Sequence, residues 1–268
     1  MKRVLLAALI VALPTVAPAQ DWAKAKLEKS PRHHEYVKVK SGDREVNCFV
    51  AYPESKDKAT AVLVIHEIFG LADWPKLLAD ELAEAGYIAI APDLLSTKDG
   101  KDTDDIASAG RDGVMKAIRD LPADQITADL DAAAKYVTAL PAANGKLAVC
   151  GFCWGGGQAF RYATNNKEIK ASCAFYGADN QLKEDDIKRI NCPVYGFYGG
   201  NDNRINSTIP KYSDMMKAAG KTYDPVVYDS GGHGFMRQGE DTNPDARDGD
   251  KKARADAWAR WKSILKEL

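Results

Sequence analysis

The chain has 268 residues, and its 37 basic and 38 acidic side chains leave a formal net charge of −1. This balance provides no excess of positive charge for nucleic acid or for an anionic membrane surface, so we expect neither as a partner. A chain of this length can bury a large core without disulfides, and it is ordinary for one α/β domain.

The first 19 residues have the pattern of a secretory signal peptide. Two basic residues precede an apolar run at 4–13, and the small residues at 17–19 provide a cleavage site after Ala19. The run is shorter than the roughly 20 apolar residues that a membrane-spanning helix needs. We therefore expect a periplasmic or secreted monomer whose mature part, 20–268, is a single domain with no membrane contact.

Short apolar runs bounded by turn residues recur after this segment, with helical patterns between them. Near-continuous apolar runs are typical of parallel strands that are buried on both faces. The expected strands are 61–66, 87–91, 146–151, 171–176, 193–198 and 225–229, and the expected helices begin near Asp73, Trp154 and Pro210 and include Trp258 to Leu268. Segments 35–40 and 45–52 are predicted to form a β-hairpin at the sheet edge. The alternation predicts an α/β fold, with a mostly parallel sheet and helices on both faces.

The stretch C-G-F-C-W-G-G-G at 150–157 is compatible with two kinds of cysteine chemistry. Cys150 and Cys153 form C-x-x-C, the motif of thiol-disulfide oxidoreductases. Gly151, Cys153 and Gly155 form G-x-C-x-G, which places a nucleophile on a strained turn between a strand and a helix. Cys150 lies inside an apolar run, where its side chain is expected to point into the sheet. We therefore favour Cys153 as a nucleophile at a helix N-terminus, where the helix dipole favours thiolate.

Two further residues complete a catalytic triad in the expected chain order. A nucleophile on such a turn needs a base and an orienting acid, which follow later strands in the order nucleophile, acid, base. Asp202 comes directly after the apolar run at 193–198, and His233 follows the run at 225–229. The order Cys153, Asp202, His233 therefore predicts a cysteine hydrolase.

The remaining cysteines and histidines show no further chemistry in their spacing. Cys48, Cys150 and Cys173 lie in apolar runs, which favours buried free thiols, although a disulfide among Cys48, Cys150, Cys173 and Cys192 stays open. His33, His34, His66 and His233 have no ligand spacing beyond one adjacent pair. We expect neither a metal nor an organic cofactor.

Five motifs together resemble the dienelactone hydrolase family of the α/β-hydrolase fold, from about residue 35 to the C-terminus. These motifs are H-E-I-F-G-L at 66–71, A-P-D-L at 91–94, G-F-C-W-G-G-G at 151–157, G-G-N-D at 199–202 and G-H-G-F at 232–235. The resemblance implies that Glu67 lies beside Cys153 and that Arg237 pairs with Glu67.

One position departs from the family pattern. Family members that act on dienelactone have an arginine shortly after the Asp-Leu pair that corresponds to Asp93 and Leu94, and it is thought to hold the substrate carboxylate. Here the nearest cation is Lys98. A lysine is a point charge and not a planar fork, so the departure puts bidentate recognition of a carboxylate in question.

These observations predict an exported hydrolase of small esters or lactones with a thioester acyl-enzyme. His233, oriented by Asp202, would activate Cys153, and the backbone amides of Ile68 and Trp154 would bind the oxyanion. The substrate pocket is expected to include Arg237, Phe69, Tyr176, Trp74 and Met236, with core packing an equal alternative for Trp74 and Tyr176. Two other functions stay open: a thiol-disulfide oxidoreductase and a small-molecule-binding protein without turnover.

Overall fold

The computed structural model describes residues 20–108 and 110–268, so the predicted signal peptide at 1–19 lies outside the described residues. The described strands form one eight-stranded sheet in the order β1-β2-β4-β3-β5-β6-β7-β8. The strands are β1 (His34–Ser41), β2 (Arg44–Ala51), β3 (Ala59–Ile65), β4 (Ile88–Pro92), β5 (Ala143–Phe152), β6 (Ile169–Phe175), β7 (Val194–Gly199) and β8 (Tyr223–Tyr228). Every predicted strand is confirmed, with ends that differ by at most three residues.

The sheet is parallel except at one edge. Strands β3 to β8 pair in parallel, whereas β1 pairs antiparallel with β2 and β2 pairs antiparallel with β4. The predicted N-terminal hairpin therefore forms this edge, next to a parallel core. Parallel strands end at the same side of a sheet, so the loops after β3, β5, β7 and β8 come together there.

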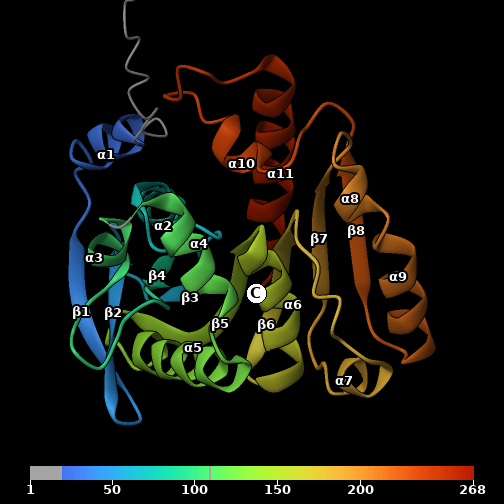
Figure 1. Ribbon diagram of the computed structural model, residues 1–268, viewed down its shortest axis with the longest axis horizontal. Coiled ribbons are helices and arrows are strands. Elements are labelled where there is room, and N and C mark those ends of the chain that lie inside the picture. Colours follow the sequence, from blue (N-terminus) through green and yellow to red (C-terminus); the bar gives the residue numbers. More distant parts are fainter. Residues whose placement is uncertain (1–19, 109) are drawn as a thin grey trace, which may run out of the picture.

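Helices cover both faces of the sheet, as Figure 1 shows. They are α1 (Asp21–Leu27), α2 (Asp73–Glu84), α3 (Thr103–Ala107), α4 (Arg111–Arg119), α5 (Ala123–Thr138), α6 (Trp154–Asn165), α7 (Glu184–Lys188), α8 (Asn203–Asn206), α9 (Ile209–Ala218), α10 (Phe235–Gln238) and α11 (Asp248–Lys266). The apolar side chains of α5, α6, α7 and α9 pack on one face, and those of α1, α2, α10 and α11 pack on the other.

The central strand β3 shows why the predicted runs are continuously apolar. Ala61, Leu63 and Ile65 belong to the core on one face, while Val62 and Val64 belong to the core on the other. All five side chains are completely buried. Alternate residues of a strand point to opposite faces, so a strand covered on both faces needs apolar residues at every position. None of the described helices is both long enough and apolar enough to span a bilayer.

Candidate active site

The backbone turns sharply at Cys153, which joins β5 to α6. Its dihedral angles are φ 55° and ψ −115°, and this left-handed φ is costly for a residue with a side chain. A Cβ atom on Gly151 would lie 1.9 Å from the carbonyl oxygen of Gly155, and one on Gly155 would lie 2.4 Å from the carbonyl oxygen of His66. The G-x-C-x-G spacing is therefore required by close backbone approach, as expected for a nucleophile elbow.

The structure brings Cys153, His233 and Asp202 into one hydrogen-bonded chain. The Nδ1 atom of His233 lies 2.5 Å from Oδ2 of Asp202, and its Nε2 atom lies 3.1 Å from Sγ of Cys153. Asp202 is nearly buried, and its other carboxylate oxygen accepts a 3.4 Å bond from the amide of Ile205. A carboxylate only accepts, so the imidazole proton resides on Nδ1 and leaves Nε2 to accept the thiol proton.

The two backbone amides expected to bind the oxyanion belong to Trp154, which follows Cys153 and hydrogen-bonds its sulfur, and to Ile68. Trp154 is the first residue of α6, so its N–H has no preceding helical carbonyl to bond. The N–H of Ile68, in the loop after β3, has no acceptor among the described residues. Both side chains pack against Leu95, Val114 and Ile118, which fixes the two segments relative to each other. The arrangement is compatible with an oxyanion hole.

Glu67 and Arg237 form a buried ion pair beside the thiol. Nε of Arg237 donates a 2.7 Å bond to Oε2 of Glu67, and the side chains are 19% and 4% exposed. Burial raises the pKa of the Cys153 thiol to about 11, with a further increase from the negative charge of Glu67. The amide of Trp154 and the charges of Arg204 and Arg237 oppose this rise. Cys153 is therefore a thiol at neutral pH in the free protein.

Tyr176 lies beside His233, directly after β6. Its ring packs edge-on against His233, with 5.4 Å between ring centroids, and its φ of 36° is unusual for a tyrosine. The side chain is completely buried, and its hydroxyl has no hydrogen-bond partner among the described residues. Burial and the nearby charge of Glu67 raise the pKa of this hydroxyl.

Three of the predicted pocket side chains lie in the core. Trp74, Tyr176 and Met236 are completely buried and belong to the core on the α2 and α11 face, which is the core-packing alternative for Trp74 and Tyr176 and a correction for Met236. The Trp74 ring packs edge-on against Phe152. Their places beside catalytic loops in the sequence did not show the direction of their side chains, which point into the core.

A family model for the dienelactone hydrolase family matches residues 46–268. The chain belongs to the dienelactone hydrolase family. The predicted resemblance and the α/β-hydrolase fold are therefore confirmed, and the chain is a hydrolase acting on ester bonds.

Similar proteins agree with this family assignment. A Salmonella typhimurium protein named "Putative carboxymethylenebutenolidase" is 33% identical over 234 residues, covering 83% of each chain. A crystal structure of a "Putative Dienelactone Hydrolase" from Klebsiella pneumoniae has a TM-score of 0.75 and 27% identity, covering 88% of this chain and 99% of that one. A dienelactone hydrolase-like phosphotriesterase from metagenomic libraries has a TM-score of 0.74 at 22% identity, a likeness of fold.

Lys98, which follows the family's Asp-Leu motif, does not lie at the site. Its ammonium group pairs with Asp43 of the β1–β2 turn, and both side chains are exposed. Asp93 of the same motif instead accepts bonds from the amide and hydroxyl of Thr103, and Thr103 also accepts a 3.1 Å bond from the amide of Leu71. The dienelactone hydrolase motif here thus holds two loops together.

Arg111, which sequence analysis missed, places a second cation beside Phe69. Its guanidinium lies 4.4 Å from the ring centroid of Phe69, and that of Arg237 lies 5.7 Å from the same ring. All three side chains line a cavity of about 630 Å³ between α1, α4 and the loop after α10. Arg111 begins α4, after a stretch of weak apolar pattern, so no sequence signal connected it with Phe69.

The four cysteines other than Cys153 are buried away from His233 and Asp202. All five are free, and Cys150 is completely buried opposite Cys173 on the neighbouring strand. Cys150 belongs to the core beneath the sheet, so it does not face solvent as a redox pair requires. Within 20–108 and 110–268, no three His, Cys, Asp or Glu side chains converge in a metal-binding arrangement.

Proposed function

We propose that this family member is an exported cysteine hydrolase of small esters or lactones that works through a thioester on Cys153. The hydrogen-bonded chain from Asp202 through His233 to Cys153 is the observation that carries the proposal. It supplies a nucleophile, a base and an orienting acid within direct contact.

In the first half-reaction, Nε2 of His233 takes the thiol proton as Sγ of Cys153 attacks the carbonyl carbon of the ester. The negative charge that develops on the carbonyl oxygen is bound by the amides of Ile68 and Trp154, each contributing about 3 kcal/mol in comparable sites. When the tetrahedral intermediate collapses, the alkoxide leaves with the proton from His233. The acyl group stays on sulfur as a thioester.

In the second half-reaction, water replaces the alcohol. His233 takes a proton from water, the hydroxide adds to the thioester carbon, and the same two amides bind the oxyanion. The C–S bond then breaks, the acid is released and the proton returns to Cys153. Each step uses groups of the chain and water only.

The cavity beside Phe69 supports a preference for substrates with a carboxylate. Arg111 presents a guanidinium group to it with no carboxylate of the described residues within ion-pair distance, although Asp21 and Asp245 also line the cavity, whereas Arg237 is already paired with Glu67. Guanidinium groups bind carboxylates bidentately. Arg111 would therefore take the role for which Lys98 is misplaced.

Export is the part of the proposal that depends on the sequence of residues 1–19. Its basic start, apolar run and small residues at 17–19 support secretion and cleavage after Ala19. Expression of the full chain in a bacterium tests it: the mass of the periplasmic protein is expected to correspond to residues 20–268. Retention of the full-length chain in the cytoplasm would contradict export without touching the hydrolase proposal.

The catalytic proposal is tested by hydrolysis of p-nitrophenyl acetate together with a reduction assay on insulin with dithiothreitol. We expect ester turnover by the native chain, an acetyl adduct on Cys153 in the mass spectrum, and no turnover by Cys153→Ala. Cys150→Ala is the matched control and is expected to keep most of the activity. Insulin reduction, or equal loss in both variants, would favour the oxidoreductase, and absence of both activities would favour a binding protein.

A further inference from the structure

A second cavity of about 300 Å³ lies on the other side of the elbow, against Trp154. It is enclosed by the end of α4, the start of α5, the first turns of α6 and the loop after β6. The side chains of Cys153, Asp202 and His233 do not line it. Its lining shares no residue with that of the cavity beside Phe69, and the residue that links it to the elbow is Trp154, which follows Cys153.

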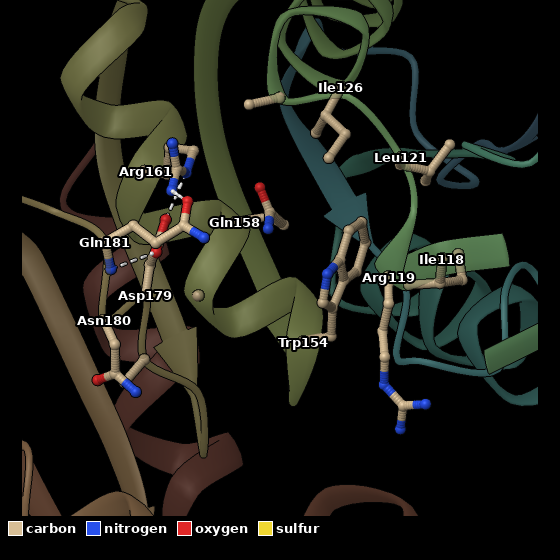
Figure 2. A pocket seen from close by; sticks show the side chains of 13 residues that line it. Ile118, Arg119, Leu121, Ile126, Trp154, Gln158, Arg161, Asp179, Asn180 and Gln181 are labelled. Atoms are coloured by element: carbon tan, nitrogen blue, oxygen red, sulfur yellow. Dashed lines mark hydrogen bonds and ion pairs between the residues drawn. The ribbon is translucent and has the colours of Figure 1, made fainter. Parts of the chain in front are cut away.

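The two walls of this cavity differ in character, as Figure 2 shows. Trp154, Leu121 and Ile126 form an apolar wall, and Arg161 and Asp179 lie on the opposite side. The two charges on that side are bonded to each other, and Asp179 also accepts a 3.0 Å bond from the amide of Gln181. The charges of the polar wall are therefore neutralised, and the other cation of the lining, Arg119, lies exposed on the Trp154 side, where solvent weakens its attraction for an anion.

Gln158 lies between the two walls and carries an unsatisfied group. Its side-chain oxygen is buried and has no hydrogen-bond partner among the described residues. A buried amide oxygen without a partner costs free energy, so such an atom at a cavity wall marks a place for a ligand group. A water molecule could hydrogen-bond the Gln158 amide oxygen, but the apolar side chains of Trp154 and Ile126 would then stay in contact with solvent.

We propose that this cavity binds a small neutral aromatic ring that carries a hydroxyl group. The volume suits a single six-membered ring with a short substituent, because it is at the lower end of small-ligand pockets. The indole of Trp154 offers an aromatic surface for the ring. A hydroxyl both donates and accepts, so it satisfies the Gln158 amide whichever end of the amide faces the cavity.

This site goes beyond ester hydrolysis, since binding there needs neither the thiol nor the base. The test uses p-cresol as the probe and toluene, which lacks the hydroxyl, as its partner. Binding is followed by the indole N–H resonances of the 15N-labelled protein, and the Trp154 resonance is identified by its loss in Trp154→Phe. We expect p-cresol to shift the Trp154 resonance and to bind roughly fivefold more tightly than toluene, the effect of one hydrogen bond.

Variants of Gln158 decide whether the amide makes that difference. Gln158→Leu is expected to bind p-cresol and toluene equally, and Gln158→Met provides the same test in a flexible side chain if the leucine variant folds poorly. Gln181→Leu, at the exposed rim of the same cavity, is the matched control and is expected to retain the preference. The proposal is overturned by equal affinities in the native protein, by a preference that persists in both Gln158 variants, or by no shift at Trp154.

Discussion

Two carboxylates of this enzyme, Asp80 on α2 and Glu67 after β3, are equally buried but differ in how they are held. Their side chains are 2% and 4% exposed. Asp80 accepts bonds from Ser30 Oγ at 2.6 Å, from Nε and Nη2 of Arg32 at 2.7 and 2.6 Å, and from His34 at 2.8 Å. These bonds hold the N-terminal segment against α2, with three of them on Oδ1 and one on Oδ2.

Glu67 is held by fewer hydrogen bonds than Asp80. Among the described residues its carboxylate accepts one hydrogen bond, from Arg237, and the buried hydroxyl of Tyr176 nearby has no partner at all. Arg237, the ion-pair partner of Glu67, also lines the cavity beside Phe69. A saturated buried carboxylate stabilises the fold, whereas a sparsely bonded one beside a nucleophile can change partners during a reaction. Variants of the two regions are therefore expected to separate stability from turnover.

The largest effect is expected on the catalytic side of this comparison. His233→Ala removes the base that contacts Cys153, so kcat/KM for p-nitrophenyl acetate should fall by about 10⁴-fold or more. The thermal midpoint should change much less than turnover, because the ring is partly exposed, although it contacts the buried side chains of Asp202 and Tyr176. Near-native turnover at neutral pH would remove the triad assignment.

Asp80→Ala is expected to show the opposite separation. It leaves Arg32 and His34 without their shared partner, and loss of one member of a buried pair typically costs about 3–5 kcal/mol. Urea unfolding measures this loss, while kcat/KM of the folded fraction should stay near the native value. Glu84→Ala, an exposed carboxylate on the same helix, is the control. A stable variant, or a folded one that has lost turnover, would refute the assigned role.

Asp80→Asn tests whether the stability that Asp80 contributes depends on pH. Burial raises the pKa of Asp80, but the hydrogen bonds from Arg32, Ser30 and His34 outweigh burial, so the pKa lies below its ordinary value. A carboxyl group with a lowered folded-state pKa stabilises the fold above its ordinary pKa, and that stabilisation is lost as pH falls through the lowered value. The stability gap between native and Asp80→Asn proteins should thus be largest at neutral pH and narrow below about pH 4. A gap that is constant with pH would contradict this.

Glu67→Gln should have a smaller effect, on the thiol. The negative charge of Glu67 raises the pKa of Cys153, so its removal is expected to increase the thiolate fraction. Alkylation by iodoacetamide at pH 7 should become roughly three- to tenfold faster, because a lower pKa yields more thiolate of somewhat lower nucleophilicity. Glu84→Gln provides the baseline. Slower or unchanged alkylation would leave Glu67 a structural or base role only.

The smallest effect is expected at the outer edge of the site, where Arg111 meets solvent. Arg111→Gln should raise KM roughly threefold for an ester that bears a carboxylate, because an exposed ion pair is weak. KM for the neutral methyl ester of the same substrate should not change. Arg119→Gln, at the other end of α4, is the matched control. An equal rise for both esters would show a packing effect on Phe69 and no charge recognition.

The sequence predicted the parts of this enzyme that depend on local pattern. Continuous apolar runs are required by strands covered on both faces, and the glycines around Cys153 are required by backbone contacts within one turn. Residues that meet through distant contacts were not predicted: Asp80 lies 48 positions from Arg32 along the chain, and nothing near either one indicates the pairing. For the same reason Met236 was placed in the pocket when it belongs to the core, the choice between pocket and core stayed open for Trp74 and Tyr176, and Arg111 was missed.

Burial of the remaining cysteines has a practical consequence for measuring this enzyme. Cys48, Cys150, Cys173 and Cys192 are at most 7% exposed, while Cys153 is partly accessible. A thiol-specific chromophore added to the folded protein should therefore consume one equivalent per chain, and five after denaturation. The first number counts accessible Cys153 thiols and one fifth of the second counts total chains, so their ratio gives the fraction of chains that are folded with an intact Cys153, without a reference standard.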